Sequence, residues 1–346
     1  MEKPKTPSPL AWKEKLAFLW LVLFTCAAGL SQVWISLGYD VQAVPEEAYR
    51  PPFRLMQHLL GTDQLGRDVL LYLIHGCRTS WLLAFPPMAL ATLVGILSGT
   101  IAATLGNNGL KISLGKLFLS GLLLLALFYF YPLFQWSTRQ WSGAFQFAVY
   151  IGCALMISYP LVKVSQKSFF KWGNKKVTIP VDEGLQKIIG IWATFPKLLL
   201  LLILTLFTPF SILTLMFWIC ATYWVLPARV SRGMVLQLQK ESYYETAQAL
   251  GIPFKRVFTH FMWPQLKGPL LTNFCFAASG LLGIGSTLAY LGIGLPADVP
   301  SWGKMLANAR FSLEAWWLIA FPSVVLLASI FSLQVIGHKF SSQAKA

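Results

Sequence analysis

The sequence predicts an all-α polytopic membrane protein, and three observations carry this prediction. The chain is 56% hydrophobic and only 12% charged, about half of the roughly 25% charged residues of soluble domains. Several apolar runs approach or exceed the ~20 residues that a helix needs to cross a bilayer. The runs are continuous rather than alternating, which excludes a β-barrel, and a helix satisfies its own backbone hydrogen bonds inside lipid.

The net charge of +15 reflects membrane topology rather than nucleic-acid binding. Lys and Arg lie at the edges of the apolar runs, where the positive-inside rule expects them, and no soluble domain is present to carry a basic face. The five cysteines are scattered without a CxxC or metal-type spacing, so we interpret them as small buried hydrophobic residues.

The apolar runs predict about eight transmembrane helices with both termini in the cytoplasm. The spans lie at about 16–37, 81–105, 117–134, 143–162, 188–207, 212–226, 269–291 and 317–336. Lysines precede the first span, and most bases then fall on the cytoplasmic side. The resulting divisions are an N-terminal tail with the first span (1–38), an external loop with an interfacial helix (39–80) and a transmembrane domain (81–340). The last of these includes an inserted hairpin at about 107–183 and a cytoplasmic loop at about 229–268.

The sequence shows none of the motifs by which a transport protein couples to an ion gradient or binds ATP. All thirteen acids map to loops or span ends, whereas an ion-coupled carrier keeps an ionisable residue inside the membrane. No GxxxxGK[ST] loop, HExxH helix or Ser-Lys pair is present. We therefore expect no catalytic residue, metal site or cofactor in this chain, and expect a partner to supply energy for any uphill transport.

The cytoplasmic stretch "ESYYETAQALGIPFKRVFTHFMWPQL", residues 241–266, interrupts the apolar pattern. It predicts a helix over 242–250, a C-terminal turn at Gly251, a break at Pro253, a second short helix over 254–262 and a new span from Pro264. The pattern alone is compatible with a passive interfacial helix or with a docking element.

The spacing of this stretch resembles the EAA signature of ABC importer permeases. Glu245, Thr246 and Ala247 are followed by three residues, Gly251, nine residues and a segment ending in Pro264, with Thr246 in place of the middle alanine. The resemblance implies that the loop is a coupling helix that seats in a groove of an ATPase subunit. The small face around Ala247 and Gly251 is then expected to allow the close approach.

Two further stretches resemble signatures of the dipeptide/oligopeptide/nickel branch of that family. They are "GTDQLGRDVLLYLIHGCRTSW" from Gly61 and "LAYLGIGLPADVPSWGKMLANAR" from Leu288, and their order is typical of a C-type subunit. The resemblance implies a type I importer core that imports oligopeptides or dipeptides across the bacterial cytoplasmic (inner) membrane. The expected partners are a B-type permease in a heterodimer, two ATPase subunits that bind ATP and Mg, and a periplasmic or lipid-anchored solute-binding protein. A nickel or other small-solute importer, and a structural or assembly subunit with this fold, are the alternatives.

The chain departs from the family pattern in two further places. The family has six spans, whereas an insertion of two apolar segments here raises the number to eight and keeps the coupling loop cytoplasmic. The insertion is either a lipid-facing packing element or a docking site for another subunit. Tyr72 stands where the family has an arginine.

The remaining candidate residues each have two interpretations. The external motif, comprising Gly61, Asp63, Gly66, Arg67 and Asp68, either forms a gate that receives the binding protein or caps and anchors a helix. The small residues of the seventh span either line a path or allow close packing; they are Ser279, Gly280, Gly283 and Ser286. His58 and His75 weakly indicate nickel, but solvated or helix-face roles are favoured, and Trp302 is expected to anchor at the interface.

Overall fold

The computed structural model describes residues 12–36, 43–53, 58–113, 176–206, 211–296, 298–312 and 314–345. The chain divides into a larger unit, Met1–Ala103 with Lys187–Ala346, and a smaller one, Thr104–Gln186. Helices dominate the described residues and confirm the all-α membrane fold class. The described helices are α1 (Trp12–Ser36), α2 (Val69–Leu105), α5 (Val181–Ala193), α6 (Lys197–Leu206), α7 (Ile212–Tyr223), α8 (Val225–Leu238), α9 (Ser242–Ala249), α10 (Phe254–Val257), α11 (Trp263–Tyr290), α12 (Trp302–Asn308) and α13 (Trp317–Lys345), with the short turns η1 (Pro45–Glu47), η2 (Phe258–Met262) and η3 (Ala309–Phe311).

The smaller unit holds a strand pair that the sequence analysis did not predict. Strand β1 (Leu110–Ser113) pairs antiparallel with β2 (Lys176–Ile179), so that Leu110 lies opposite Ile179. The Gly106 carbonyl accepts a hydrogen bond from the Asp182 amide at 3.3 Å, and the Asn107 side chain accepts one from the Glu183 amide at 3.0 Å. The two ends of the insertion are therefore tied together where it leaves and rejoins the main chain.

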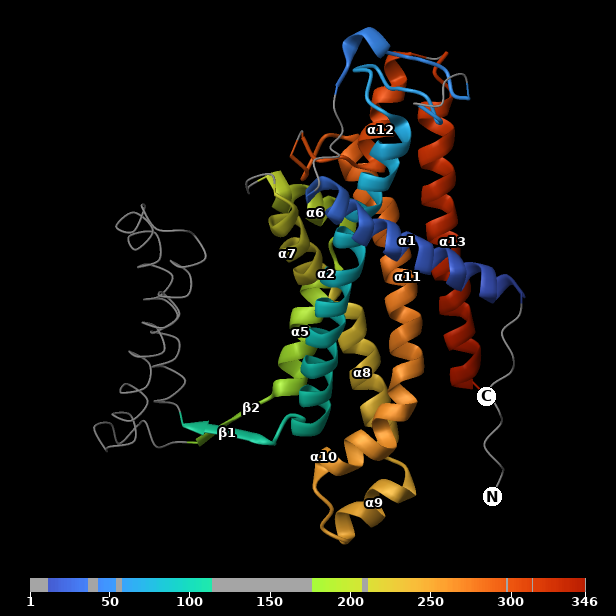
Figure 1. Cartoon of the computed structure of the whole chain (residues 1–346). Coiled ribbons are helices and arrows are strands. Elements are labelled where there is room, and N and C mark those ends of the chain that lie inside the picture. The colour runs from blue at the N-terminus through green and yellow to red at the C-terminus, as the bar shows by residue number, and fades with distance from the viewer. Residues whose placement is uncertain are drawn as a thin grey trace. The chain divides into compact units, whose positions relative to one another are not determined.

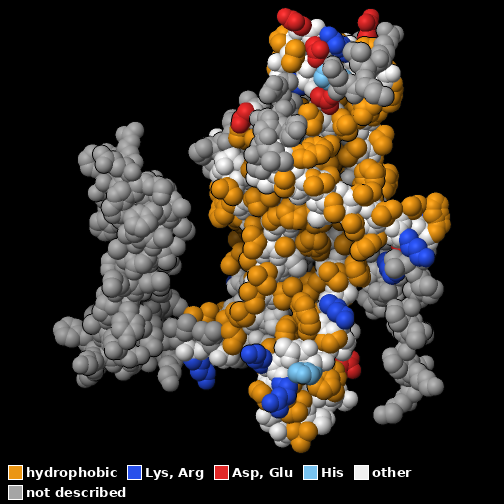
Figure 2. Space-filling model, in the orientation of Figure 1, with side chains coloured by type: hydrophobic (Ala, Val, Ile, Leu, Met, Phe, Trp, Pro, Cys, Tyr) orange, Lys and Arg blue, Asp and Glu red, His pale blue; other side chains and the backbone are white. Residues whose placement is uncertain are grey.

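Helices α2, α11 and α13 run alongside one another in the larger unit, and α1 crosses them obliquely (Figure 1). Side-chain contacts fix this crossing: the Trp20 indole donates to the Ser329 hydroxyl at 3.1 Å, and the Lys339 ammonium bonds the Glu14 carboxylate at 2.8 Å. Hydrophobic side chains cover the middle of the bundle, and charged ones gather toward its two ends (Figure 2). This banding is the pattern of a membrane-embedded bundle.

Five described helices are long and apolar enough to cross a membrane, and they coincide with predicted spans. They are Trp12–Trp34, Val69–Leu105, Ile212–Leu238, Phe254–Tyr290 and Trp317–Ser342. Helices α5 and α6 form a sixth candidate that is bent by 82° at residues 194–196, where one predicted span was expected. The two predicted spans at 117–134 and 143–162 lie outside the described residues, so the total of eight stays a prediction.

Three predicted boundaries are wrong. The interfacial helix before residue 81 is not separate, because α2 runs unbroken from Val69 to Leu105 through Pro86 and Pro87, prolines that transmembrane helices tolerate. The polar loop predicted from residue 229 begins only after Leu238, because arginines near a helix end extend their charged heads to the surface without ending the helix. At its other side the loop ends at Phe254, where the helix that contains α10, η2 and α11 begins.

Two glycines bring α2 into close contact with α8. A Cβ atom on Gly95 would lie 2.6 Å from the Pro227 Cβ, and one on Gly99 would clash with the Ser231 hydroxyl and the Ala228 carbonyl. The Ser231 hydroxyl also donates to the Gly95 carbonyl at 3.1 Å. Small residues allow backbones to approach in this way inside lipid, where helices gain no hydrophobic association energy.

We predict that Gly99→Ala destabilises the chain by about 1–3 kcal/mol, the usual cost of overpacking, whereas Gly233→Ala does not. Gly233 lies in α8 itself, where an added Cβ meets nothing within 4 Å, and alanine is the better helix former. Thermal unfolding of the full chain in nanodiscs, followed by circular dichroism, checks both variants. Equal melting temperatures for the two variants would contradict the proposed contact.

Candidate functional site

Helix α9 and the turn that follows it have the predicted form. The Gly251 amide donates to the Gln248 carbonyl at 3.0 Å, and the Ile252 amide donates to the Ala247 carbonyl at 3.0 Å. Gly251 adopts φ +69°. These two bonds and the left-handed glycine form a Schellman motif, which satisfies the last carbonyls of the helix and fixes the direction of the chain beyond it.

Ala247 faces the protein interior, which corrects the expectation that it lies on the docking face. Its side chain is 6% exposed and packs in an apolar cluster with Val235 and Leu238 of α8 and Met262 and Leu266 of the next helix. The small side chain at this position therefore brings α9 close to its own bundle. The cluster makes the polar loop a rigid extension of α8 and α11.

The outer surface of the loop presents a different set of side chains. Glu245, Thr246 and Gly251 are exposed, and their role in docking stays a prediction. Leu250 is 73% exposed, a position that its apolar character did not predict. The available signal was its place directly before a left-handed glycine, where the chain turns away from the packed face of the helix.

Pro264 occupies the second position of α11, immediately after the π-helical turn η2. A proline lacks the amide hydrogen and clashes with the carbonyl four residues before it. The wider turn accommodates this, and the Trp263 amide bonds the Phe258 carbonyl instead.

The Tyr243 ring stacks on Phe261 with ring centroids 5.6 Å apart. Burial together with the charge of Glu241 raises the pKa of Tyr243.

Residues 43–53 and 58–68, here called the cap loop, cover the beginning of α2. Gly61 and Gly66 adopt φ +81° and +72°. A Cβ atom on Gly61 would lie 2.6 Å from the Arg50 carbonyl, and one on Gly66 would clash with Val44. The two glycines of the external motif are therefore required by backbone conformation and by close packing.

The acids and the base of this motif serve as caps and anchors, one of the two predicted interpretations. The Asp63 carboxylate accepts hydrogen bonds from the amides of Leu65 (2.9 Å) and Arg67 (3.0 Å) and from the Arg67 guanidinium (2.7 Å). Asp68 accepts from the Leu71 amide at 3.0 Å, which caps α2. The Arg67 guanidinium lies 4.8 Å from the centre of the Tyr72 ring, so the residue that replaces the family's arginine holds an arginine from the preceding turn.

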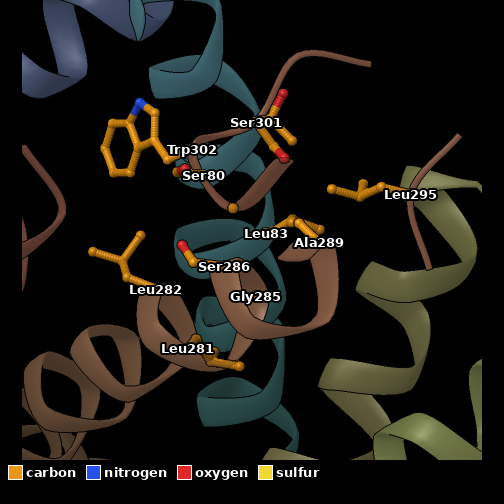
Figure 3. A pocket seen from close by; sticks show the side chains of 12 residues that line it. Ser80, Leu83, Leu281, Leu282, Gly285, Ser286, Ala289, Leu295, Ser301 and Trp302 are labelled. Atoms are coloured by element: carbon orange, nitrogen blue, oxygen red, sulfur yellow. The ribbon is translucent and has the colours of Figure 1, made fainter. Parts of the chain in front are cut away.

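Trp302 is completely buried, which corrects the expectation of an interfacial anchor. Its indole donates to the Leu73 carbonyl at 3.0 Å and lies against Gly76, where a Cβ would be 2.5 Å from the ring. Gly303 packs directly on the Ser286 backbone. Ser286 and Ser80 lie beside Trp302 around a small cavity (Figure 3). Its volume of about 10 Å³ has room for one water molecule and excludes a peptide.

The four small residues of α11 divide between two faces. Gly280 is exposed and Gly283 is partly exposed, and a Cβ on either would meet nothing within 4 Å. Ser279 is buried and donates to the Phe276 carbonyl at 2.8 Å, and Ser286 lines the cavity beside Trp302. Close packing accounts for the two serines, and path lining stays a prediction for the two glycines.

His58 is neither solvated nor on a helix face, which corrects the favoured interpretation. Its ring nitrogens lie 2.8 Å from Asp68 Oδ2 and 2.8 Å from Glu47 Oε2. Burial lowers the pKa of His58, but the hydrogen bonds and charges of Asp68 and Glu47 outweigh burial, so the pKa is raised above its ordinary value. His75 is buried and bonds the Ser31 hydroxyl at 2.7 Å. Within the described ranges, no group of three or more His, Cys, Asp or Glu side chains has a metal-binding arrangement.

The chain is similar to one protein family model and to several known transport proteins. A family model described as "Binding-protein-dependent transport system inner membrane component" matches residues 176–340. The oligopeptide transport system permease protein OppC of Bacillus subtilis is 29% identical over 202 residues, which cover 58% of this chain and 64% of that protein. The di/tripeptide transport system permease protein DppC of Pseudomonas aeruginosa is 25% identical over 93% of this chain and 83% of that protein. The Escherichia coli OppC protein is 27% identical over 45% of this chain and 52% of that protein.

We predict that Trp302→Ala lowers the free energy of unfolding by about 3–5 kcal/mol, the usual cost of emptying a large buried aromatic site. The matched control is Trp316→Ala, because that side chain is 53% exposed and its loss should have little effect. Far-UV circular dichroism during denaturant unfolding measures both variants without depending on indole fluorescence. If the Trp302→Ala protein has the same free energy of unfolding as the control, the conclusion that the buried Trp302 side chain stabilises the fold is wrong.

Proposed function

Because the chain belongs to the binding-protein-dependent family of ABC importer permeases as a C-type subunit, we propose that it carries short peptides across the bacterial cytoplasmic membrane with energy from partner ATPases. The observation that carries this proposal is the exposed tip of α9, with Glu245, Leu250 and Gly251 held on a rigid apolar base. A surface fixed in this way can transmit a push from a partner to the spans behind it.

The tip of α9 has the properties of a docking element. Leu250 offers an apolar anchor, and Gly251 adds no side chain beside it, so a groove on a partner can close over both. The cluster under Ala247 connects this tip to α8 and α11. Closure of two ATPase subunits on ATP would move the tip and, with it, both spans, which switches the path between its two open states.

The subunit itself contributes binding and motion rather than hydrolysis. ATP and Mg would be held by the two ATPase subunits, and the path would be completed by a B-type permease in a heterodimer. A periplasmic or lipid-anchored solute-binding protein would deliver the cargo to the cap loop. Lys and Arg side chains gather around the α9 end of the view and most acids at the other end (Figure 2), which supports a cytoplasmic α9 and cytoplasmic termini.

Peptides are the favoured cargo because the relatives are named as oligopeptide and di/tripeptide permeases. A small solute such as a nickel chelate is the second candidate within transport, on the strength of the shared signatures. A structural or assembly subunit with this fold is the candidate outside transport. A structural or assembly subunit would not need the exposed surface of Leu250 and Gly251 for docking to an ATPase.

We predict that Gly251→Leu abolishes association with the ATPase subunits while the chain still inserts. A Cβ at this position meets no atom within 4 Å among the described residues, so the leucine side chain would project toward the partner. At φ +69° the leucine also strains the turn, and Gly251→Ala, which has the same strain but adds only a methyl group, separates the two effects. Gly251→Asn is the matched control, because asparagine tolerates the left-handed conformation and is smaller. Co-purification from membranes and ATP-dependent uptake provide the two readouts. Full association and uptake in Gly251→Leu would exclude this docking mode.

We predict that deletion of the gene reduces uptake of labelled di- and oligopeptides at least tenfold and leaves uptake of nickel unchanged. The comparison needs a strain complemented with the intact chain and one complemented with Gly251→Leu. Loss of nickel uptake with normal peptide uptake would select the small-solute alternative. Normal uptake of both would support the structural or assembly role.

A further inference from the structure

The cap loop contains a histidine held between two carboxylates, and the proposed transport cycle does not use it. His58 Nδ1 lies 2.8 Å from Asp68 Oδ2, and Nε2 lies 2.8 Å from Glu47 Oε2. All three side chains are largely withdrawn from solvent, with exposures of 17%, 13% and 22% for His58, Asp68 and Glu47. We propose that this triad is a proton-dependent latch, in which protonated His58 fastens residues 43–53 to the beginning of α2 and neutral His58 loosens them.

The chemistry of imidazole makes the latch depend on one proton. A protonated ring has two N–H groups and can donate to both carboxylates at once, whereas a neutral ring has one donor and one acceptor nitrogen. After deprotonation, one carboxylate therefore faces a lone pair at 2.8 Å, which is repulsive. One of the two charge-assisted bonds that join the cap loop to α2 must then break.

The two carboxylates belong to the parts that the latch would join. Glu47 is the last residue of η1 in residues 43–53, and Asp68 is the cap of α2. The Glu47 carboxylate also pairs with Arg50 at 3.0 Å. Backbone hydrogen bonds from Tyr49 to Asp63 and from Thr62 to Arg50, both 3.1 Å, remain when His58 is neutral, so loss of the His58 bond would loosen residues 43–53 without detaching them.

The charges around His58 favour its protonated form. Among the described residues around the triad, Arg50 is paired with Glu47, and Arg67 is paired with Asp63. Helix α13 contributes the uncharged Trp317, whose indole donates to the Thr62 carbonyl at 3.0 Å. The net surroundings of His58 are therefore acidic, which favours the protonated ring.

The direction of the pH effect follows from linkage. The pKa of His58 is raised above about 6.5 in the folded chain. Its contribution to cap-loop stability is therefore complete below about pH 6.5 and is lost as the pH rises through the raised value. A cap loop on the outer side of the membrane would sense the external medium, so alkaline medium would loosen it whatever the cargo of the permease.

Hydrogen exchange of the full chain in nanodiscs tests the latch on the peptide covering residues 43–53. After correction for intrinsic exchange, we expect protection to fall about tenfold between pH 6 and pH 8.5, the effect of losing one charge-assisted bond of about 1.4 kcal/mol. His58→Gln should show low protection at both pH values. A wild-type protection that is the same at both pH values would overturn the proposal.

Two further variants keep the test independent of a folding defect in His58→Gln. Glu47→Gln removes one carboxylate and leaves the Asp68 cap of α2 in place, so it should also lose the pH dependence. Glu46→Gln is the matched control, because Glu46 lies in the same turn and is exposed, and it should titrate like the wild type. Persistence of the pH dependence in both His58→Gln and Glu47→Gln would assign it to another group and overturn the latch.

Discussion

Helices inside a bilayer gain nothing from hiding apolar side chains from one another, since lipid is as apolar as leucine, and this constraint determines how the bundle is assembled. Van der Waals packing between closely approaching helix backbones must stabilise helix association instead. Helix α2 provides it at two levels, through Gly76 under Trp302 and through Gly95 and Gly99 against α8. At these positions the glycines of α2, rather than its leucines, allow the close approach.

The two polar ends of the protein obtain rigidity by different means. The cap loop is held by ion pairs and caps, among them Asp63 with Arg67 and Asp68 at the start of α2. The polar loop around α9 is held by an apolar cluster and a Schellman turn. Electrostatic fastening is weakened by screening and by changes of protonation, whereas apolar packing carries no charge to be screened or titrated. The end with the ion pairs is therefore the one whose stability the surrounding solution can change.

The spans and the turn at Gly251 were predictable because they depend on local signals, namely apolar length and the conformational freedom of glycine. The start of α2 was not, because nothing in residues 69–81 distinguishes an interfacial turn from the first turns of a long helix. The inward direction of Ala247 and the burial of Trp302 depend on contacts with α8 and with Gly76, which are distant in the sequence. His58 was misread for the same reason, since its partners are ten and eleven residues away across a folded loop.

The continuous helix from Phe254 to Tyr290 has a mechanical consequence. Its 37 residues make a rod of about 55 Å at 1.5 Å per residue, with the α9 base at one end and the contact of Ser286 with Gly303 near the other. A tilt of about 5° at the base would displace the far end by about 5 Å over that length. The π turn at η2 lies near the α9 end of this helix, within the apolar cluster that holds α9. A displacement at one membrane surface would thus reach the opposite surface through a single continuous helix.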